Sequence, residues 1–392
     1  MKISHIDFFT LRCSIPSNHP RPLASFVRDG AIFLRVHTDD GITGIGEPSP
    51  YGAPLKDMIK ILDEVLIPKW IGCNPLDIAN LTYQDSKKVG YGNVGQNALV
   101  AGFSQALWDI YGKIEGKPVY KLINPYSNGR IKAYASAGMW FEEGPLEEVV
   151  NEALIYLKEG FNFYKLRPET PLKAGNHIQR NLKPPKVNLK RFVRLLQKIN
   201  LATNGQLQIM VDVGCRLDFE QALYLGRAME ELNCFFLEEP IARDYKESSR
   251  LKKKLKINIA GGENLVSCLQ FIPWVENKAL DYLQPDANLA GINEIIKIDK
   301  LAEANQLKII LHNWTNDINN AANVHLGTAL KTCKMVEANL TYNPLKNKLL
   351  KDKGLTLKEG EFVINDKPGL GVELDESVLY KYAFDPYSFS KG

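Results

Sequence analysis

The sequence predicts an α/β protein, a (β/α)8 barrel of the TIM type preceded by a smaller α+β domain. Three observations support this prediction. The chain has 392 residues, which suits two domains. After residue 128, eight short apolar segments rich in β-formers alternate with mostly single helical segments. A polar residue stands at the end of nearly every such segment, where a TIM barrel builds its active site.

The composition is that of an ordinary water-soluble globular protein. Hydrophobic residues make up 45% and charged residues 24% of the chain, and the net charge is only +4. Basic and acidic residues are mixed along the chain, whereas nucleic-acid-binding proteins cluster their basic residues. We therefore expect no nucleic-acid partner, and neither a disordered nor a fibrous protein.

The predicted location is the cytoplasm, with no membrane association. The six cysteines are scattered and form no Cys-x-x-Cys pair, which fits free thiols in a reducing compartment. The chain starts directly with strand-like alternation rather than with a basic segment and a long apolar core. No run reaches the roughly 18 apolar residues of a membrane span.

Residues 1–128 are predicted to form the α+β domain, which we expect to cap the barrel. Strand-like alternation runs from Ile3 to about Glu47, and Asp40-Gly41 predicts a tight hairpin turn within it. Two segments with apolar residues at helical spacing follow, at 57–71 and 96–114. Strands followed by helices indicate an α+β unit.

Residues 129–355 are predicted to form the barrel. Its expected strands are 131–138, 161–167, 207–213, 234–240, 257–263, 280–286, 307–313 and 334–338. Residues 356–392 are rich in Gly and turn residues and do not continue this pattern. We expect this last segment to pack back on the N-terminal domain.

Titratable residues recur at the predicted strand ends. They are Lys165, Asp212, Glu238, Glu263, Asp286, His312 and Glu337, and from Asp212 onward they are spaced 23 to 26 residues apart. One such residue alone is more often a rim or helix-capping residue. Six at one period indicate the catalytic end of a TIM barrel.

Three carboxylates, those of Asp212, Glu238 and Glu263, end consecutive strands and should converge. They would repel one another without a cation, so a divalent ion is expected between them. Oxygen ligands without Cys or His favour Mg²⁺ over Zn²⁺. Such an ion can stabilise an enediolate formed by proton loss beside a carboxylate.

Several motifs in this order resemble the mandelate racemase subgroup of the enolase superfamily, within the mandelate racemase/muconate lactonizing enzyme family. The motifs are DGITGIGE (40–47), ALWDIYGKIEGKPVYKL (106–122), FLEEP (236–240), GGE (261–263), QPD (284–286), LHNW (311–314), VE (336–337) and KPGLGVELD (367–375). They span nearly the whole chain, and the ordered set is far more specific than any single motif.

The resemblance implies an enolase-like modified barrel and a role for each strand-end residue. Asp212, Glu238 and Glu263 would bind Mg²⁺, and His312 with Asp286 would form an acid/base dyad. Lys165-Leu166-Arg167 corresponds to the family's Lys-x-Lys, and Glu337 to a carboxylate that hydrogen-bonds the substrate's carboxylate. The family habit also implies a homo-oligomer.

Two positions depart from the family pattern. Arg167 replaces the second catalytic lysine, and a guanidinium is a poor base because it stays protonated. This argues against a racemase, which needs a base on each face of the reacting carbon. Gly214 stands where an Asn often follows the first ligand, which removes a possible substrate contact.

Four further residues are candidates for contact with substrate. Tyr51 lies in the loop 48–55, which corresponds to a specificity-setting cap of the family. His177 lies in the long segment 168–187, where Lys173 is a second candidate and a solvated loop is the simpler interpretation. Trp140 and Trp314 follow strand ends and are candidate pocket walls.

The favoured function is that of an acid-sugar dehydratase acting on a small-molecule carboxylate. Lys165 or His312 would remove the C2 proton, and loss of the C3 hydroxyl would give a 2-keto-3-deoxy acid. The alternative is a racemase, epimerase or cycloisomerase acting through the same enediolate. A non-catalytic binding barrel is the remote third possibility, because every expected ligand and both dyad residues are present.

Overall fold

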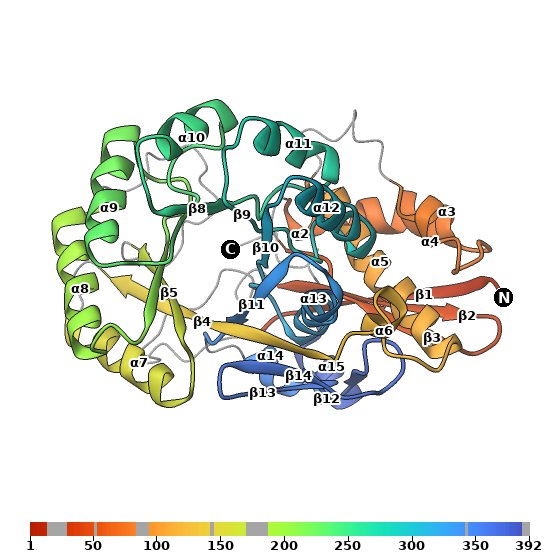
Figure 1. Ribbon diagram of the computed structural model, residues 1–392. Coiled ribbons are helices and arrows are strands. Elements are labelled where there is room, and N and C mark those ends of the chain that lie inside the picture. Colours follow the sequence, from red (N-terminus) through yellow and green to blue (C-terminus); the bar gives the residue numbers. More distant parts are fainter. Residues whose placement is uncertain are drawn as a thin grey trace.

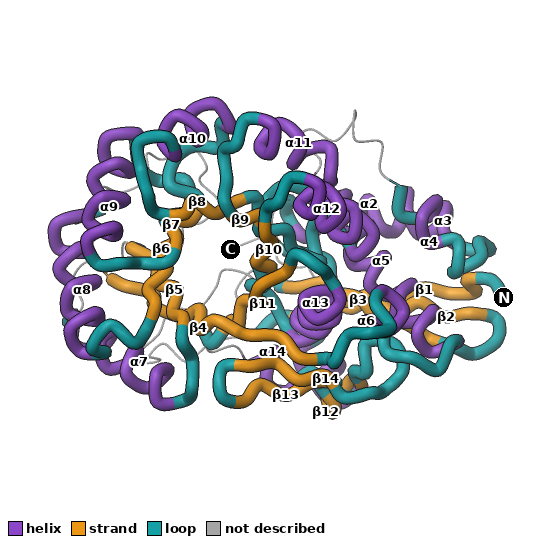
Figure 2. Tube along the Cα trace, in the orientation of Figure 1, coloured by secondary structure: helices purple, strands orange, loops and turns teal. Residues whose placement is uncertain are grey.

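The computed structural model describes residues 1–13, 30–50, 53–83, 94–141, 145–169, 187–341 and 344–385. Its centre is a closed barrel of eight parallel strands, seen nearly end-on in Figure 2. The strands are β4 (Arg130–Phe141), β5 (Phe163–Glu169), β6 (Gln208–Asp212), β7 (Phe236–Glu238), β8 (Asn258–Gly261), β9 (Tyr282–Leu283), β10 (Lys308–Leu311) and β11 (Cys333–Asn339). The last strand pairs with the first, with Val336 opposite Ala133, so the predicted TIM barrel is confirmed.

Helices cover the outside of the barrel (Figure 1). Each of the first seven strands is followed by one helix: α7 (Leu146–Lys158), α8 (Leu189–Ala202), α9 (Phe219–Glu231), α10 (Tyr245–Lys252), α11 (Cys268–Glu276), α12 (Ile292–Ala304) and α13 (Asp317–Ala329). The eighth strand is followed by a short helix, α14 (Pro344–Lys348). This last unit makes the barrel a modified one.

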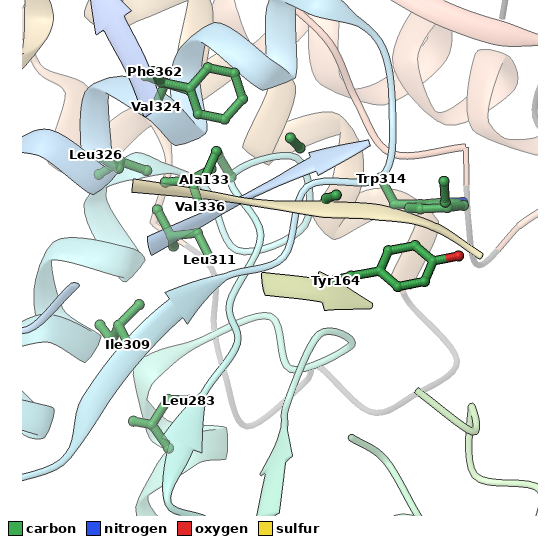
Figure 3. Close-up of a cluster of buried hydrophobic side chains, with 14 of the residues drawn as sticks. Ala133, Tyr164, Leu283, Ile309, Leu311, Trp314, Val324, Leu326, Val336 and Phe362 are labelled. Carbon is green, nitrogen blue, oxygen red and sulfur yellow. The ribbon is translucent and has the colours of Figure 1, made fainter. Parts of the chain in front are cut away.

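Alternation along the strands separates two apolar layers. In β6, Met210 belongs to a small cluster with Phe236 and Ile310 from other strands, inside the barrel. Its neighbours Ile209 and Val211 belong to the large core between strands and helices. Figure 3 shows part of that large core, where Leu311, Val336 and Ala133 from adjacent strands lie side by side.

The N-terminal domain is an antiparallel sheet backed by helices. The sheet contains β1 (Ile3–Leu11), β2 (Ala31–Thr38) and β3 (Thr43–Gly46). The helical elements are α2 (Leu55–Ile61), a π-helical turn η1 (Leu62–Leu66), α3 (Ile67–Trp70), α4 (Ile78–Leu81), α5 (Val94–Ile114) and α6 (Val119–Ile123).

The glycines of the Gly-Ile-Gly sequence in β3 let helix α5 lie directly on the sheet. A Cβ at Gly44 would lie 2.1 Å from the carbonyl oxygen of Ala106, and one at Gly46 would lie 1.9 Å from that of Gly102. Any side chain would push the helix away. The helix in turn brings Gln105 to the boundary with the barrel, where its side chain contacts Asn319.

Residues 350–385, called the C-terminal segment from here on, join both parts of the molecule and begin before the predicted bound at residue 356. The segment contains β12 (Leu350–Asp352), β13 (Leu355–Lys358), β14 (Glu361–Ile364), β15 (Glu373–Leu374) and α15 (Glu376–Tyr382). Strand β14 pairs antiparallel with the start of β4, which the sequence did not indicate. Farther along, the amide of Phe384 donates to Thr10 O at 3.0 Å, so this end of the segment contacts the N-terminal sheet.

Among the helices of the described part of the chain, none has the length and apolar character needed to cross a bilayer.

Candidate active site at the carboxyl end of the barrel

Three carboxylates meet at the ends of β6, β7 and β8. Asp212, Glu238 and Glu263 each offer an oxygen, and these oxygens lie within 4.8 Å of one another. Asp212 and Glu238 are direct neighbours across the parallel ladder, which places both side chains on the same face of the sheet. Glu263 follows Gly262, whose φ of 103° ends β8 with a turn that favours glycine. The sequence therefore brings these three groups together through strand register and one turn.

Lys165 lies at the centre of the site, fully buried on β5. Its Nζ is 3.0 and 2.9 Å from the two oxygens of Glu238, and 2.9 Å from Glu337 Oε1. Burial disfavours the charge on Lys165, but Glu238 and Glu337 outweigh it and hold the pKa above its usual value. Burial likewise disfavours the charge on Glu337, yet Lys165 and His312 lower the pKa of that carboxyl. The lysine is therefore an ammonium group clamped by two carboxylates.

Arg167 lies on the same face of β5, two residues farther along. Its Nε donates to Asp212 Oδ2, and its guanidinium carbon lies 4.0 Å from the ring centroid of Trp314. Trp314 is 6% exposed, so the stack is largely shielded from water. Arg167 is thus a fixed positive charge beside the carboxylate cluster.

The predicted dyad residues are in contact. His312 Nδ1 lies 2.6 Å from Asp286 Oδ2, and an ionised carboxylate only accepts, so Nδ1 carries the hydrogen. His312 Nε2 points toward the cluster, 3.3 Å from Glu263 Oε2. Burial opposes the charge on the imidazole, but Glu263, Glu337 and Asp286 outweigh it and raise the pKa to about 10. A cation bound among these carboxylates would oppose that rise.

Some residues at the site were missed by the sequence analysis. Gln284 Nε2 donates to Glu238 Oε2 at 2.9 Å, and Arg243 lies 3.6 Å from Glu263 Oε1. The amide of Asn313 donates to Glu337 Oε2 at 2.9 Å. Gln284 had a usable signal, because it precedes Asp286 by two positions at a strand end. Arg243 had none, since it lies in a loop after β7.

Most of the remaining residues predicted to contact substrate lie outside the described side chains. Tyr51 and His177, together with Lys173, lie outside the described residues. Trp140 belongs to β4, and only its backbone is described. Gly214 has a φ of 54°, and its amide donates to Asp212 Oδ1 at 2.8 Å, so a backbone group contacts the expected ligand here.

Comparison with known proteins identifies the class. Residues 10–124 match the family described as mandelate racemase / muconate lactonizing enzyme, N-terminal domain. Residues 148–378 match the family described as enolase C-terminal domain-like. The chain belongs to the mandelate racemase/muconate lactonizing enzyme family of the enolase superfamily, which confirms the resemblance found in the sequence.

Similar proteins include both lyases and isomerases. Arabinonate dehydratase of Saccharolobus solfataricus is 29% identical over 356 residues, covering 90% of each chain. D-galactonate dehydratase of Pectobacterium atrosepticum is 28% identical over 359 residues, covering 89% of this chain and 90% of that one. The solved structure of 3,6-anhydro-D-galactonate cycloisomerase from Zobellia galactanivorans is 25% identical with a TM-score of 0.81, covering 98% of this chain and 100% of that one.

Proposed function

We propose that this protein is a Mg²⁺-dependent acid-sugar dehydratase. One arrangement carries the proposal: the His312–Asp286 dyad and Lys165 face a single carboxylate cluster that can hold a cation. The similarity to arabinonate and D-galactonate dehydratases over about nine-tenths of the chain supports the same reaction class.

The carboxylate cluster fits a divalent cation. All three groups offer oxygen, and the ligand atoms already lie within 4.8 Å of one another. Mg²⁺ takes oxygen ligands at about 2.0–2.1 Å, so small side-chain movements would suffice. We propose Asp212, Glu238 and Glu263 as its ligands. When bound, the ion would stabilise negative charge developing on the substrate's carboxylate.

Dehydration needs one base for C2 and one acid for C3. A base removes the C2 proton, and the electron pair enters the enediolate of the carboxylate. The C3–O bond then breaks as an acid protonates the leaving hydroxyl, giving water and an enol that becomes the 2-keto-3-deoxy acid. We assign these two tasks to Lys165 and His312, in either order, with Asp286 holding the imidazole. The group that acts as the base must first lose the proton that its carboxylate neighbours favour, and a cation bound to those carboxylates would promote that loss.

Arg167 and Glu337 complete the proposed site. A guanidinium does not act as a base, so Arg167 makes symmetric two-base racemisation unfavourable. Its guanidinium donates a hydrogen bond to Asp212 in the carboxylate cluster, where its positive charge could stabilise the enediolate. Glu337 would have to gain a proton before it could donate to the substrate's carboxylate, because an ionised carboxylate only accepts.

The test is a screen of mono- and diacid sugars with Mg²⁺, using semicarbazide to detect 2-keto acids. We expect at least one acid sugar to give a keto acid, with the signal lost in His312→Asn and after treatment with EDTA. Restoration by Mg²⁺ would support the metal assignment. Keto-acid formation that survives in His312→Asn would contradict the proposed role of the dyad.

A second candidate, an isomerase, is favoured by the similarity to the cycloisomerase structure. It shares the enediolate but releases no water. Exchange of a substrate's C2 proton in D₂O without keto-acid formation would decide for the isomerase. If neither keto-acid formation nor C2 proton exchange is found across a broad library of substrates, a non-catalytic barrel is favoured.

We further propose a cytoplasmic homo-oligomer. All six cysteines are free, which suits a reducing compartment. Sedimentation of the purified protein, in the presence and absence of reductant, would test both the assembly and its independence of disulfides.

A further inference from the structure

The carboxylate of Asp286 has different partners on its two oxygens. Oδ2 lies 2.6 Å from His312 Nδ1. Oδ1 accepts from the side-chain amides of Asn319 at 2.9 Å and Asn323 at 3.0 Å, and from the amide of Asn288 at 3.2 Å. Asp286 is 1% exposed, so these donors replace water around its charge. One oxygen is thereby occupied, and the other is left to the imidazole.

Asn319 is in turn oriented from the N-terminal domain. Gln105 on α5 donates from Nε2 to Asn319 Oδ1 at 3.1 Å, and its own Oε1 accepts from the amide of Glu47 at 2.9 Å. An asparagine amide has acceptors at one end and donors at the other. Because Gln105 supplies a donor to Oδ1, the NH₂ group of Asn319 must face Asp286. A rotated amide would place oxygen against the carboxylate.

Glu47, at the end of β3, also holds the backbone of the helix that carries Asn319. Its Oε2 accepts from the amide of Asn319 at 3.1 Å. Its Oε1 accepts from the amide of Asn316 at 2.8 Å and from that residue's side chain at 2.9 Å. Helix α13 therefore begins against a carboxylate of the other domain. Glu47, Gln105 and Asn319 are all fully buried, so this network excludes solvent.

We propose that Asn319 is a positioning residue for catalysis, and that Gln105 and Glu47 make the N-terminal domain part of the machinery that holds the dyad. Asn319 fixes the rotation of Asp286. Asp286 in turn fixes the tautomer and orientation of His312, with Nε2 toward the carboxylate cluster. This inference rests on the acid/base role given to His312 in the proposed function.

The alternative is that the hydrogen bonds of Glu47, Gln105 and Asn319 only hold the two domains together, as other polar contacts between the domains do. Asn293 on α12 provides such a link: its Oδ1 accepts from Trp108 Nε1 on α5 at 2.7 Å, and its amide nitrogen lies 3.4 Å from Thr82 Oγ1. It joins the same two parts of the molecule through the same chemical group. Its partners lie on α5 and after α4, away from the dyad. Asn293→Leu is therefore the matched control for Asn319→Leu.

The experiment measures the dyad without requiring turnover. Full-length protein labelled with ¹⁵N-histidine and saturated with Mg²⁺ should show a strongly deshielded Nδ1 proton, assigned to His312 by its loss in His312→Asn. We expect this resonance to move or disappear in Asn319→Leu and to stay in place in Asn293→Leu. Gln105→Met removes the hydrogen-bond partner of Asn319 Oδ1 and of the Glu47 amide but leaves Asp286 and its donors in place, so it should move the resonance in the same direction by less.

Kinetics on an acid sugar that the protein dehydrates gives the second measurement. Asn319→Leu should lower kcat about 10- to 100-fold, as removal of an orienting residue does elsewhere, and leave KM within about twofold. Asn293→Leu should change neither. An unchanged resonance and kcat in Asn319→Leu, or equal changes in both variants, would overturn the inference.

Two further outcomes are separable. If Asn319→Leu does not fold, Gln105→Met carries the test, because Gln105 hydrogen-bonds Glu47 and Asn319 rather than Asp286. A resonance unmoved in Gln105→Met would then overturn the inference. If no acid sugar is turned over by the wild type, the proposed function fails, while the resonance still decides whether Asn319 orients the dyad.

Discussion

Two buried histidines, His312 at the end of β10 and His325 within α13, lie in contrasting regions of the molecule. His312 is 5% exposed and His325 is 1% exposed, so burial is nearly the same. His312 faces the carboxylates of Asp286 and Glu263 at the catalytic end of the barrel. His325 lies where the barrel meets α6 and the C-terminal segment.

The neighbours of each ring determine which nitrogen must carry a hydrogen, and that nitrogen is Nδ1 in His312 and Nε2 in His325. Around His325, the amide of Tyr120 donates to Nδ1 at 3.1 Å, so Nε2 carries the hydrogen and lies 3.2 Å from the carbonyl of Leu370. Burial lowers the pKa of His325 to about 4, whereas the carboxylates raise that of His312 to about 10 despite burial. Burial alone makes a histidine a neutral cross-link between segments. Converging carboxylates make it an acid/base candidate.

The largest expected effect comes from making the surroundings of His312 more like those of His325. Asp286→Asn removes the charge and permits the wrong tautomer. We expect kcat for keto-acid formation to fall by up to about 10⁴-fold, the loss seen when an orienting aspartate of a catalytic histidine is amidated.

Steady-state kinetics on an acid sugar that the wild-type protein dehydrates would measure this loss. Asp299→Asn is the control, since Asp299 is also buried but binds the backbone amides of Lys331 and Thr332. We expect that variant to lose stability and keep its kcat. A small fall in kcat for Asp286→Asn would mean that His312 does not need the Asp286 carboxylate for its acid/base role.

Arg167 offers an intermediate effect at the catalytic end. Arg167→Met removes a charge that contacts Asp212 and stacks on Trp314. We expect kcat/KM to fall about 100-fold, similar to the removal of one group that stabilises an oxyanion. Arg167→Lys keeps the charge but loses the planar stack, and should lie between the wild type and Arg167→Met. Equal rates in all three proteins would exclude a role in the enediolate step.

The last expected effect is on stability rather than on rate, and it concerns the His325 region. The folded-state pKa of His325, about 4, lies below its unfolded value of about 6.5, so the unfolded chain takes up a proton first as the pH falls. The stabilisation is full above pH 6.5 and is lost as the pH falls toward 4, up to about 3 kcal/mol. Denaturant unfolding between pH 4 and pH 7 measures it.

His325→Gln isolates this contribution. Glu47, whose pKa burial raises to about 7, acts in the opposite direction in both proteins, because its folded form binds a proton more readily than the unfolded chain. Between pH 7 and pH 4 the free energy of unfolding of the wild type should therefore fall relative to that of the variant, and this difference isolates His325. Parallel curves would mean that the pKa of His325 is not lowered in the folded state.

Much of the fold and of the candidate site was predictable because both repeat along the chain. Apolar segments at a regular spacing predicted the barrel strands, and the titratable residue at the end of nearly every one marked the catalytic end. Strand register then placed Asp212 opposite Glu238, as parallel pairing requires. The positions of the proposed ligands and of His312 and Asp286 were accessible because each occupies the same place in its βα unit, whereas the pairing of His312 with Asp286 as a dyad came from the family resemblance.

The contacts that cross between units had no such pattern. The pairing of β14 with β4 joins residues more than 200 positions apart, and Gln105 meets Asn319 across 214 positions. A glutamine within a helix and an asparagine within another carry no local sign of being partners. Their contact depends on how α5 is seated on β3, which the close approach at Gly44 and Gly46 decides.

The sequence by itself determined which groups stand at the barrel's catalytic end, because period-two strands and regular βα spacing fix that end locally. The tertiary structure alone decided how those groups are held: Lys165 between Glu238 and Glu337, and Asp286 between His312 and Asn319, the latter contacted by Gln105 of the N-terminal domain. Buried charges select partners by distance in three dimensions rather than by position in the chain, and only packing sets those distances.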